Sequence, residues 1–192
     1  MLKPQAVQKV NKIKVVIGVV LCAAFFLSGF IQNKISPRLQ QKLNAAVQTT
    51  FEVEHFNLRA ISVAGNINTK TPVELGNENL FEIKSKDSLI GYVYLGQAPS
   101  MKNVFDYVVL FNTDMSIKKS KVLIYREDYG RQIGSQRWLK QFIGKKSGDQ
   151  LSYGEDIDAI SGATISAKSM TKAINEVLES FGDLVKKQLD EV

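Results

Sequence analysis

The sequence predicts an α+β protein, with an N-terminal transmembrane helix followed by a mainly antiparallel sheet with flanking helices. Three observations support this fold class. An uncharged apolar run fills residues 15–31 of the 192-residue chain. Five segments with strand-type patterns, joined mostly by short links, lie between residues 56 and 126, and helix-period patterns flank them on both sides. A Rossmann fold is disfavoured because no Gly-x-Gly-x-x-Gly motif follows a strand.

The first part of the chain predicts a membrane anchor. Residues 1–14 are polar and basic, and residues 15–31 are long enough, at the lower end of the range, to span a lipid bilayer. A cleaved signal peptide is the alternative, but its apolar core would be shorter and small residues would mark a cleavage site. Lysines before the run, and few after it, orient the N-terminus to the cytoplasm. We therefore expect a cytoplasmic tail (1–14), a single-pass anchor in the cytoplasmic (inner) membrane (15–31) and a domain on the periplasmic or extracellular side (37–192).

Composition narrows the possible functions. The net charge is +6, but much of the excess precedes the apolar run, and no basic stripe with interleaved aromatic residues follows it. We therefore expect no nucleic-acid partner. The single cysteine, Cys22, lies inside the apolar run, so no internal disulfide and no thiol chemistry outside the membrane is available. The single histidine, His55, is better explained as a lone surface or core residue than as part of a zinc site or a catalytic triad.

The pattern of apolar residues predicts the elements of the domain in order. An amphipathic stripe over residues 38–51 predicts a helix that leads from the membrane into the domain, whereas a coiled-coil stalk would need a longer stripe. The second and third strand segments predict a hairpin across residues 85–88, after a polar loop (66–79). A helix containing Trp138 follows the last strand. The predicted strands cover residues 56–63, 80–84, 89–95, 104–112 and 117–126.

A turn of small residues, Asp-Ala-Ile-Ser-Gly-Ala-Thr (158–164), precedes a long amphipathic helix that runs to the C-terminus. A helix start carries unpaired backbone N–H groups and the positive end of the helix dipole, which favour an anion. The hydroxyls of Ser161 and Thr164 lie next to the place where a phosphate would bind. From these residues alone a plain helix cap is the commoner arrangement, in which a hydroxyl accepts the first N–H bonds and Gly162 turns the chain.

The same turn resembles the covalent flavin attachment motif of the extracytoplasmic FMN-binding domain family. That domain occurs in the G subunit of the Rnf electron-transport complex, in the C subunit of the sodium-pumping NADH:quinone reductase, and in single-domain membrane-anchored relatives, which this chain resembles more. The resemblance implies a phosphoester between the FMN phosphate and the hydroxyl of Thr164, made by a separate Mg-dependent flavin transferase with FAD as the donor. It also implies that Asp158 orders the turn or is recognised by the transferase. The matching residues are Asp158, Ser161, Gly162, Ala163, Thr164 and the following hydroxyl residue Ser166.

A second segment is similar to the Glu-Thr-Pro-Gly-x-Gly loop and the Trp-Leu-x-x-Phe helix that lie against the flavin in this family. Asp128 and Tyr129 replace the threonine and the proline. The resemblance implies that Glu127, Gly130 and Trp138 also bind the cofactor. The alternatives are a solvated turn acid for Glu127 and core packing for Trp138. Aromatic residues available to pack on the flavin ring are Tyr92, Tyr94, Tyr107, Tyr125 and Trp138.

Together these features predict a membrane-anchored electron-transfer flavoprotein, a carrier or redox-complex subunit that passes electrons from a membrane partner to an extracytoplasmic acceptor. We expect no catalytic residues of its own. We also expect no metal site, because Glu155, Asp156 and Asp158 lack the spacing of a calcium loop. One alternative is a non-redox membrane-anchored binding or scaffold domain that retains the fold. Another is a hydrolase with Ser161 or Thr164 as the nucleophile, for which the sequence offers no convincing base.

Overall fold

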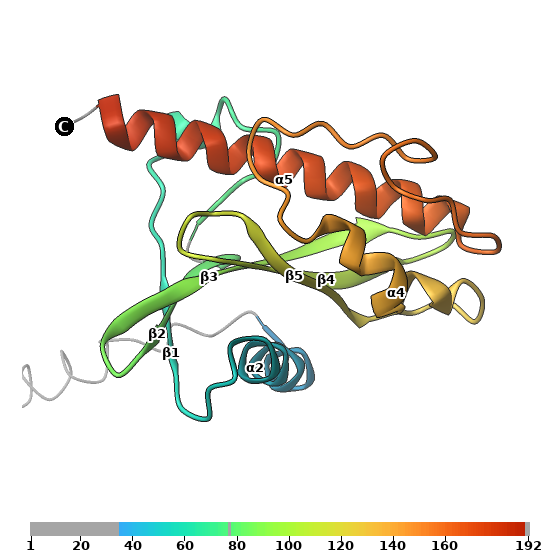
Figure 1. Cartoon of the computed structure of the whole chain (residues 1–192), viewed down its shortest axis with the longest axis horizontal. Helices are drawn as coiled ribbons and strands as arrows, with labels where there is room; N and C mark the ends of the chain where they lie inside the picture. The colour runs from blue at the N-terminus through green and yellow to red at the C-terminus, as the bar shows by residue number, and fades with distance from the viewer. Residues whose placement is uncertain (1–34, 77, 191–192) are drawn as a thin grey trace, which may run out of the picture. The chain divides into compact units, whose positions relative to one another are not determined.

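A five-stranded antiparallel sheet forms the middle layer of the domain (Figure 1). The strands are adjacent in space in the order in which they follow one another in the chain, so the sheet is a simple meander. The prediction of an antiparallel α+β domain is confirmed. The strands are β1 (Asn57–Ala60), β2 (Leu80–Ser85), β3 (Ser88–Pro99), β4 (Val104–Phe111) and β5 (Ile117–Ile124).

The computed structural model describes residues 35–76 and 78–190. The predicted tail (1–14) and the predicted anchor (15–31) lie outside these residues. Among the residues that are described, no helix combines the length and the apolar character needed to cross a bilayer.

The β2–β3 hairpin turns within two residues. Lys86 and Asp87 both adopt left-handed backbone conformations, with φ of 48° and 64°, and Ser85 pairs with Ser88. Two consecutive left-handed residues are typical of a type I′ turn, whose twist matches that of the two strands. The predicted hairpin is therefore confirmed at the predicted place.

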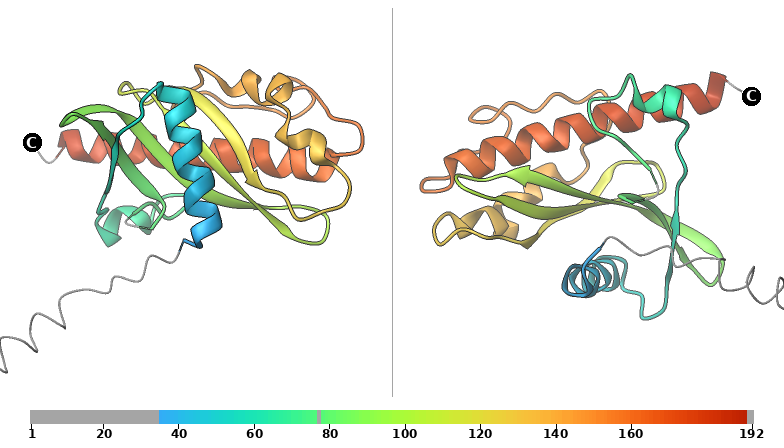
Figure 2. Two further views of the ribbon diagram at one scale, coloured as in Figure 1. Left: turned by 90° about the horizontal axis from the view of Figure 1, so that it is seen from below. Right: turned by 180° about the vertical axis from the view of Figure 1, so that it is seen from behind.

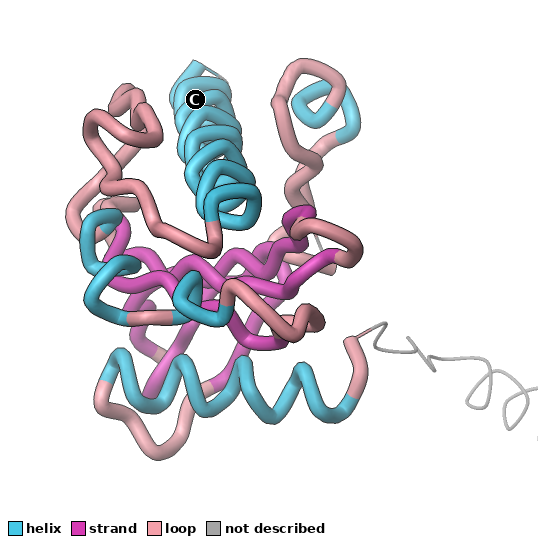
Figure 3. The backbone as a smooth tube through the Cα atoms, turned by 90° about the vertical axis from the view of Figure 1, so that its right-hand side faces the viewer, coloured by secondary structure: helices cyan, strands magenta, loops and turns pink. Residues whose placement is uncertain are grey.

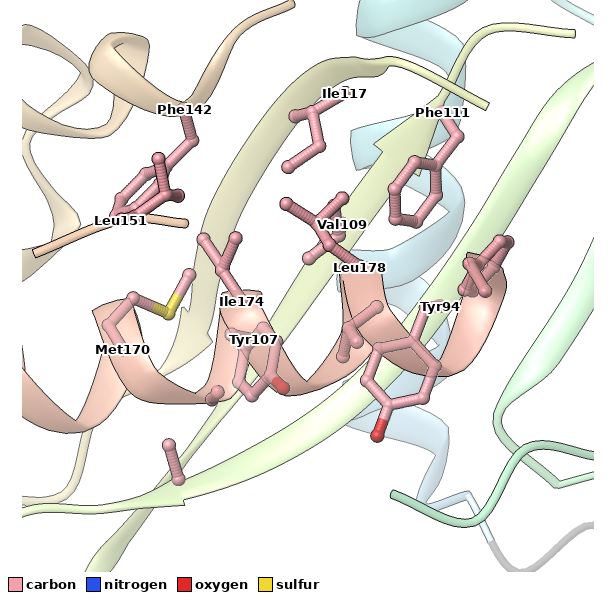
Figure 4. Packing of buried hydrophobic residues seen from close by; sticks show 14 of the residues in the cluster. Tyr94, Tyr107, Val109, Phe111, Ile117, Phe142, Leu151, Met170, Ile174 and Leu178 are labelled. Atoms are coloured by element: carbon pink, nitrogen blue, oxygen red, sulfur yellow. The ribbon is translucent and has the colours of Figure 1, made fainter. Parts of the chain in front are cut away.

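Helix α5 (Thr164–Asp190) covers one face of the sheet. Its apolar side packs on alternate residues of the strands, as Figure 4 shows for Tyr107, Val109 and Ile174. The ring of Phe111 on β4 stacks on Phe181 of α5, with ring centroids 4.6 Å apart. The long amphipathic pattern at the end of the sequence thus forms the larger of the two cores.

Helix α2 (Pro37–Phe51) covers the opposite face and lies across the strands (Figure 2). The hydroxyl of Ser36 caps the helix by accepting the N–H of Leu39 at 3.3 Å, and Pro37 occupies the first turn, where its missing N–H costs nothing. The end-on view in Figure 3 shows helices on both sides of the sheet. The helix is therefore part of the folded domain, which argues against the coiled-coil alternative. Its buried residues Leu43, Ala46 and Val47 form a second core with Val93, Val108 and Leu110.

The strand predicted at 56–63 is shorter, as β1, and the strand predicted at 89–95 is longer, as β3. Two further differences concern short helices. The loop predicted at 66–79 overlaps a short helix, α3 (Gly65–Asn68). The single helix predicted around Trp138 is instead three short pieces, η1 (Arg131–Gly134), α4 (Gln136–Leu139) and η2 (Lys140–Phe142). Ser135 has an extended backbone between the first two pieces, and Gly144, in a left-handed conformation, follows the last. These local turns limit each piece to about one helical turn.

Leu43→Ala tests whether α2 is an integral part of this domain. Leu43 is fully buried in the second core, so its truncation should reduce the free energy of unfolding by about 2–5 kcal/mol. Lys42→Ala, at the adjacent exposed position of the same helix, should change it by less than about 0.5 kcal/mol. Urea unfolding followed by circular dichroism measures both, and equal small effects would mean that α2 does not pack on the sheet in solution.

Candidate functional site

A groove of about 570 Å³ lies where three segments of the chain meet. Its walls are the β3–β4 turn (101–103), the segment that leaves β5 (125–129) and the first turn of α5 with the residues before it (162–166). The start of α5 lies at the same end of the sheet as α4 (Figure 1). Two of the three walls, 125–129 and 162–166, contain residues of the two motifs identified in the sequence. These two walls are more than thirty residues apart in the chain.

The start of α5 leaves its first amides open. The first helical hydrogen bond runs from the N–H of Ala167 to the carbonyl of Ala163 at 2.9 Å, so Ala163, which has no polar side chain, occupies the capping position. Among the described residues, no acceptor bonds the N–H groups of Thr164, Ile165 or Ser166. The plain-cap alternative is therefore not what forms, because neither Ser161 nor Thr164 accepts a helix amide. The helix start keeps its capacity to bind an anion.

The Thr164 hydroxyl is accessible at this same point. Thr164 is exposed, and its Oγ1 donates a long hydrogen bond of 3.4 Å to the carbonyl of Ile160. Gly162 adopts φ of +75°, a left-handed conformation that turns the chain into the helix. Ser161 is exposed but does not line the groove. Hydroxyl, open amides and groove therefore converge on the first turn of α5.

Trp138 holds the approach to this turn rather than lining the groove. Its indole N–H donates to the carbonyl of Asp158 at 2.7 Å, and the side-chain amide oxygen of Gln141 accepts the N–H of the same residue at 2.9 Å. The indole is 6% exposed and packs edge-on against Phe142. The structure thus places Trp138 in the core, as the packing alternative expects, with a direct bond to the turn that precedes α5. The Asp158 side chain is exposed and makes no hydrogen bond with the described residues.

The carboxylate of Glu127 ties two walls of the groove together. One of its oxygens accepts hydrogen bonds from the hydroxyl of Ser100 at 2.6 Å and from the N–H groups of Lys102 and Asn103 at 2.7 and 2.8 Å. These bonds, led by that from Ser100, stabilise the ionised form and lower the pKa of Glu127 to about 2. Glu127 is therefore an anchor for the β3–β4 turn, and the solvated-turn alternative does not describe it.

Gly130 packs the segment after β5 closely against the turn that precedes α5. Its φ is +79°, and a Cβ placed on it would lie 2.7 Å from the Tyr125 hydroxyl and 3.1 Å from the carbonyl of Gly162. The Tyr125 hydroxyl in turn lies 2.9 Å from the buried hydroxyl of Ser166 in the first turn of α5. The two motifs of the sequence are therefore in direct contact, and only glycine fits between them.

An ion pair between the buried Asp106 and the more exposed Arg126 holds Arg126 at the groove. Asp106 on β4 is 1% exposed, and its carboxylate accepts bonds from Gln97 at 2.6 Å and from Arg126 at 2.5 Å. Arg126 also donates to the carbonyl of Val104 at 2.9 Å, and it lines the groove. Sequence reasoning missed this pair because its members lie 20 residues apart in the chain and meet only in the folded sheet. With Lys102 nearby, it gives the groove two cationic side chains.

The rim of the groove is apolar and exposed. Met101 is 73% exposed, Tyr129 is 86% exposed and Ile165 is 50% exposed, and each comes from a different wall. Exposed apolar side chains gathered around a groove are typical of a ligand site. The sequence analysis did not identify Met101 or Ile165 as site residues. For Ile165 the sequence holds one signal, since it is an apolar residue that does not belong to the buried stripe of α5.

Of the five aromatic residues considered for ring packing, only Tyr125 lines the groove. Tyr94 and Tyr107 are buried between the sheet and α5, where burial raises the pKa of both phenols. Tyr92 packs at the edge of the same core. These three side chains stabilise the fold.

Comparison with known proteins gives one family. The family model of the FMN-binding domain matches residues 102–179, a segment that contains the loop after β5, the turn before α5 and most of α5 itself. Among solved structures, the chain is similar to the crystal structure of Shewanella oneidensis NqrC, with a TM-score of 0.45 and 17% sequence identity over 66% of this chain and 69% of that chain. No curated protein sequence matches it.

Gly130→Ala tests the contact between the two motifs. The substitution adds backbone strain of about 1–2 kcal/mol for a left-handed residue, and it also adds the clash with the Tyr125 hydroxyl. Gly144→Ala is the matched control, because Gly144 has a similar φ of +82° and nothing within 4 Å of the added Cβ. Thermal unfolding should show a larger loss for Gly130→Ala than for Gly144→Ala. Equal losses would mean that the contact is absent.

Glu127→Gln tests the tie between the walls through its pH dependence. The folded-state pKa of about 2 lies below the usual value of 4.5, so ionised Glu127 stabilises the folded state above pH 4.5. That stabilisation is lost as the pH falls from 4.5 towards 2. The wild type should therefore lose more unfolding free energy than Glu127→Gln across this acid range. Parallel pH profiles for the two proteins would contradict the assignment.

Proposed function

We propose that this chain is an electron-transfer flavoprotein that carries FMN covalently, through a phosphoester to Thr164, because residues 102–179 match the family model of the FMN-binding domain. The observation that carries the proposal is the start of α5. An exposed hydroxyl and three amides without acceptors among the described residues occur there together, at the edge of a groove.

The residues at this helix start fit the phosphate of FMN. A phosphate esterified to Thr164 keeps a negative charge, and the N–H groups of Thr164, Ile165 and Ser166 are placed to bind it. The positive end of the dipole of α5 adds to this attraction. A separate flavin transferase, with FAD as the donor, would make the bond, and the exposed Asp158 on the approach to the turn is available for it to recognise.

The groove fits the rest of the cofactor. Its volume of about 570 Å³ lies within the range of small-molecule sites, roughly 300–1,000 Å³. The apolar rim suits the faces of a flat ring system, and Lys102 and Arg126 suit its polar edge. FMN would supply the electron chemistry, while this chain holds the cofactor, orients it and tunes its surroundings. No acid–base pair or nucleophile of the protein is needed.

Membrane anchoring completes the proposal. The apolar run at 15–31, with lysines before it, supports a single-pass anchor in the cytoplasmic membrane and a domain on the extracytoplasmic side. A cofactor outside the membrane is lost by dilution if it is weakly bound, which gives a covalent bond its advantage. The electron donor and the acceptor would be a membrane protein and an extracytoplasmic protein.

Two alternatives are weaker. A non-redox scaffold domain is supported only by Asp128 and Tyr129, which replace the threonine and the proline of the family pattern. Both residues line the groove, so the replacements do not remove them from the site. The flavin absorption spectrum of protein purified from its native host distinguishes this alternative. A hydrolase would need a base near the hydroxyls, but His55 follows α2 and lines a different pocket, together with residues of α2, β1 and β2. No side chain among the described residues hydrogen-bonds the hydroxyl of Ser161 or Thr164.

Thr164→Val tests the attachment residue. The variant keeps the shape of the side chain and removes the hydroxyl, so the protein co-produced with a flavin transferase should lose the whole mass gain of FMN minus water. Ser161→Ala is the control, because it removes an exposed hydroxyl three residues earlier in the same turn and should keep the gain. Intact-mass spectrometry measures both. Covalent flavin in Thr164→Val would disprove the assignment.

A further inference from the structure

We propose that Tyr129 contacts the cofactor directly and stacks its ring on the isoalloxazine ring of the bound FMN. This inference rests on the proposed function, and it gives a role to a residue that stands where the family pattern has proline. Four observations carry it, and they concern the backbone around Tyr129, its side chain, the opposite wall of the groove and the position of Thr164.

The backbone on both sides of Tyr129 is held in place. Two positions before it, Glu127 is bound to the β3–β4 turn by three hydrogen bonds. One position after it, Gly130 is wedged against the Tyr125 hydroxyl and the carbonyl of Gly162. The Cα of Tyr129 is therefore fixed at the wall of the groove, although its side chain is exposed.

The side chain itself has no partner in the described part of the protein. It is 86% exposed, the highest value among the exposed large apolar side chains, and its hydroxyl makes no hydrogen bond there. No aromatic ring of the described residues packs against it. An aromatic ring gains free energy when its faces are covered, through area burial and through the geometry of ring stacking. A fixed backbone with an uncovered ring beside a groove points to a flat ligand.

The opposite walls of the groove present matching surfaces. Met101 and Ile165 expose apolar side chains from the β3–β4 turn and from α5, so apolar groups border the groove on all three of its walls. Thioether and aliphatic groups pack well on aromatic faces. An isoalloxazine ring in this groove would bury Tyr129 together with one or both of them.

Attachment of FMN to Thr164 would place its isoalloxazine ring near Tyr129. A phosphoester on Thr164 fixes one end of FMN in the wall formed by residues 162–166, and Tyr129 lies in the neighbouring wall of the same groove. The two walls are in contact through Gly130 and Gly162. The ring is thus confined close to Tyr129 for as long as the cofactor is attached.

Flavin fluorescence tests the contact in the full-length protein co-produced with a flavin transferase. A photoexcited flavin takes an electron from a tyrosine that it touches and returns it without emitting light, whereas phenylalanine is too hard to oxidise to do so. Tyr129→Phe should therefore lengthen the flavin fluorescence lifetime severalfold, while Tyr129→Trp keeps it short. Tyr92→Phe is the matched control, because Tyr92 lies on β3 outside the groove and its loss should leave the lifetime unchanged.

The outcomes separate the two proposals. A wild-type lifetime in Tyr129→Phe, in protein whose mass shows bound FMN, overturns the stacking inference and leaves the attachment intact. Absence of FMN from the wild type overturns the proposed function and this inference with it. Tyr129 is exposed, and Tyr92→Phe removes only a hydroxyl and keeps the ring that packs on the core, so all three substitutions should keep the wild-type circular dichroism spectrum.

Discussion

The burial of strand β4 on both faces is the constraint on which the rest of the domain depends. Tyr107, Val109 and Phe111 face the core beneath α5, and Val108 and Leu110 face the core beneath α2. Because a helix covers each face of the sheet at β4, this strand offers no open face to a ligand, and the groove lies at an end of the strands. The groove occurs at such an end, where the β3–β4 turn, the segment after β5 and the start of α5 converge. The two cores therefore decide where the site is, and the loops decide its chemistry.

The start of α5 shows what this arrangement costs. A helix whose capping residue is Ala163 lacks the side-chain cap that Ser, Thr, Asp or Asn would provide, a loss of about 1 kcal/mol. The neighbouring turn is held instead by bonds from outside the helix, through Trp138 and Gln141 to Asp158, and by the contact of Gly130 with Gly162. The rigid surroundings allow the first amides of the helix to stay open for an anion. The match of residues 102–179 to the family model of the FMN-binding domain agrees with this use of the helix start.

Local patterns predicted most of the fold and the centre of the site. Strand alternation, the Lys86-Asp87 turn and the stripe of α5 are encoded within a few residues of one another, so they could be identified from the sequence. The groove rim and the pair of Asp106 with Arg126 could not, because they join residues that are distant in the chain. Trp138 shows both sides of this limit. Its place in a motif can be identified from the sequence, but its hydrogen bond to the Asp158 carbonyl depends on tertiary packing.

The crystal structure of the flavin-loaded protein is the decisive test of covalent attachment at α5. We expect the FMN phosphate to be bonded to the Thr164 oxygen and to accept hydrogen bonds from the N–H groups of Thr164, Ile165 and Ser166. A phosphate bound at another place, or a side chain capping those three amides while the flavin is attached, would contradict this expectation.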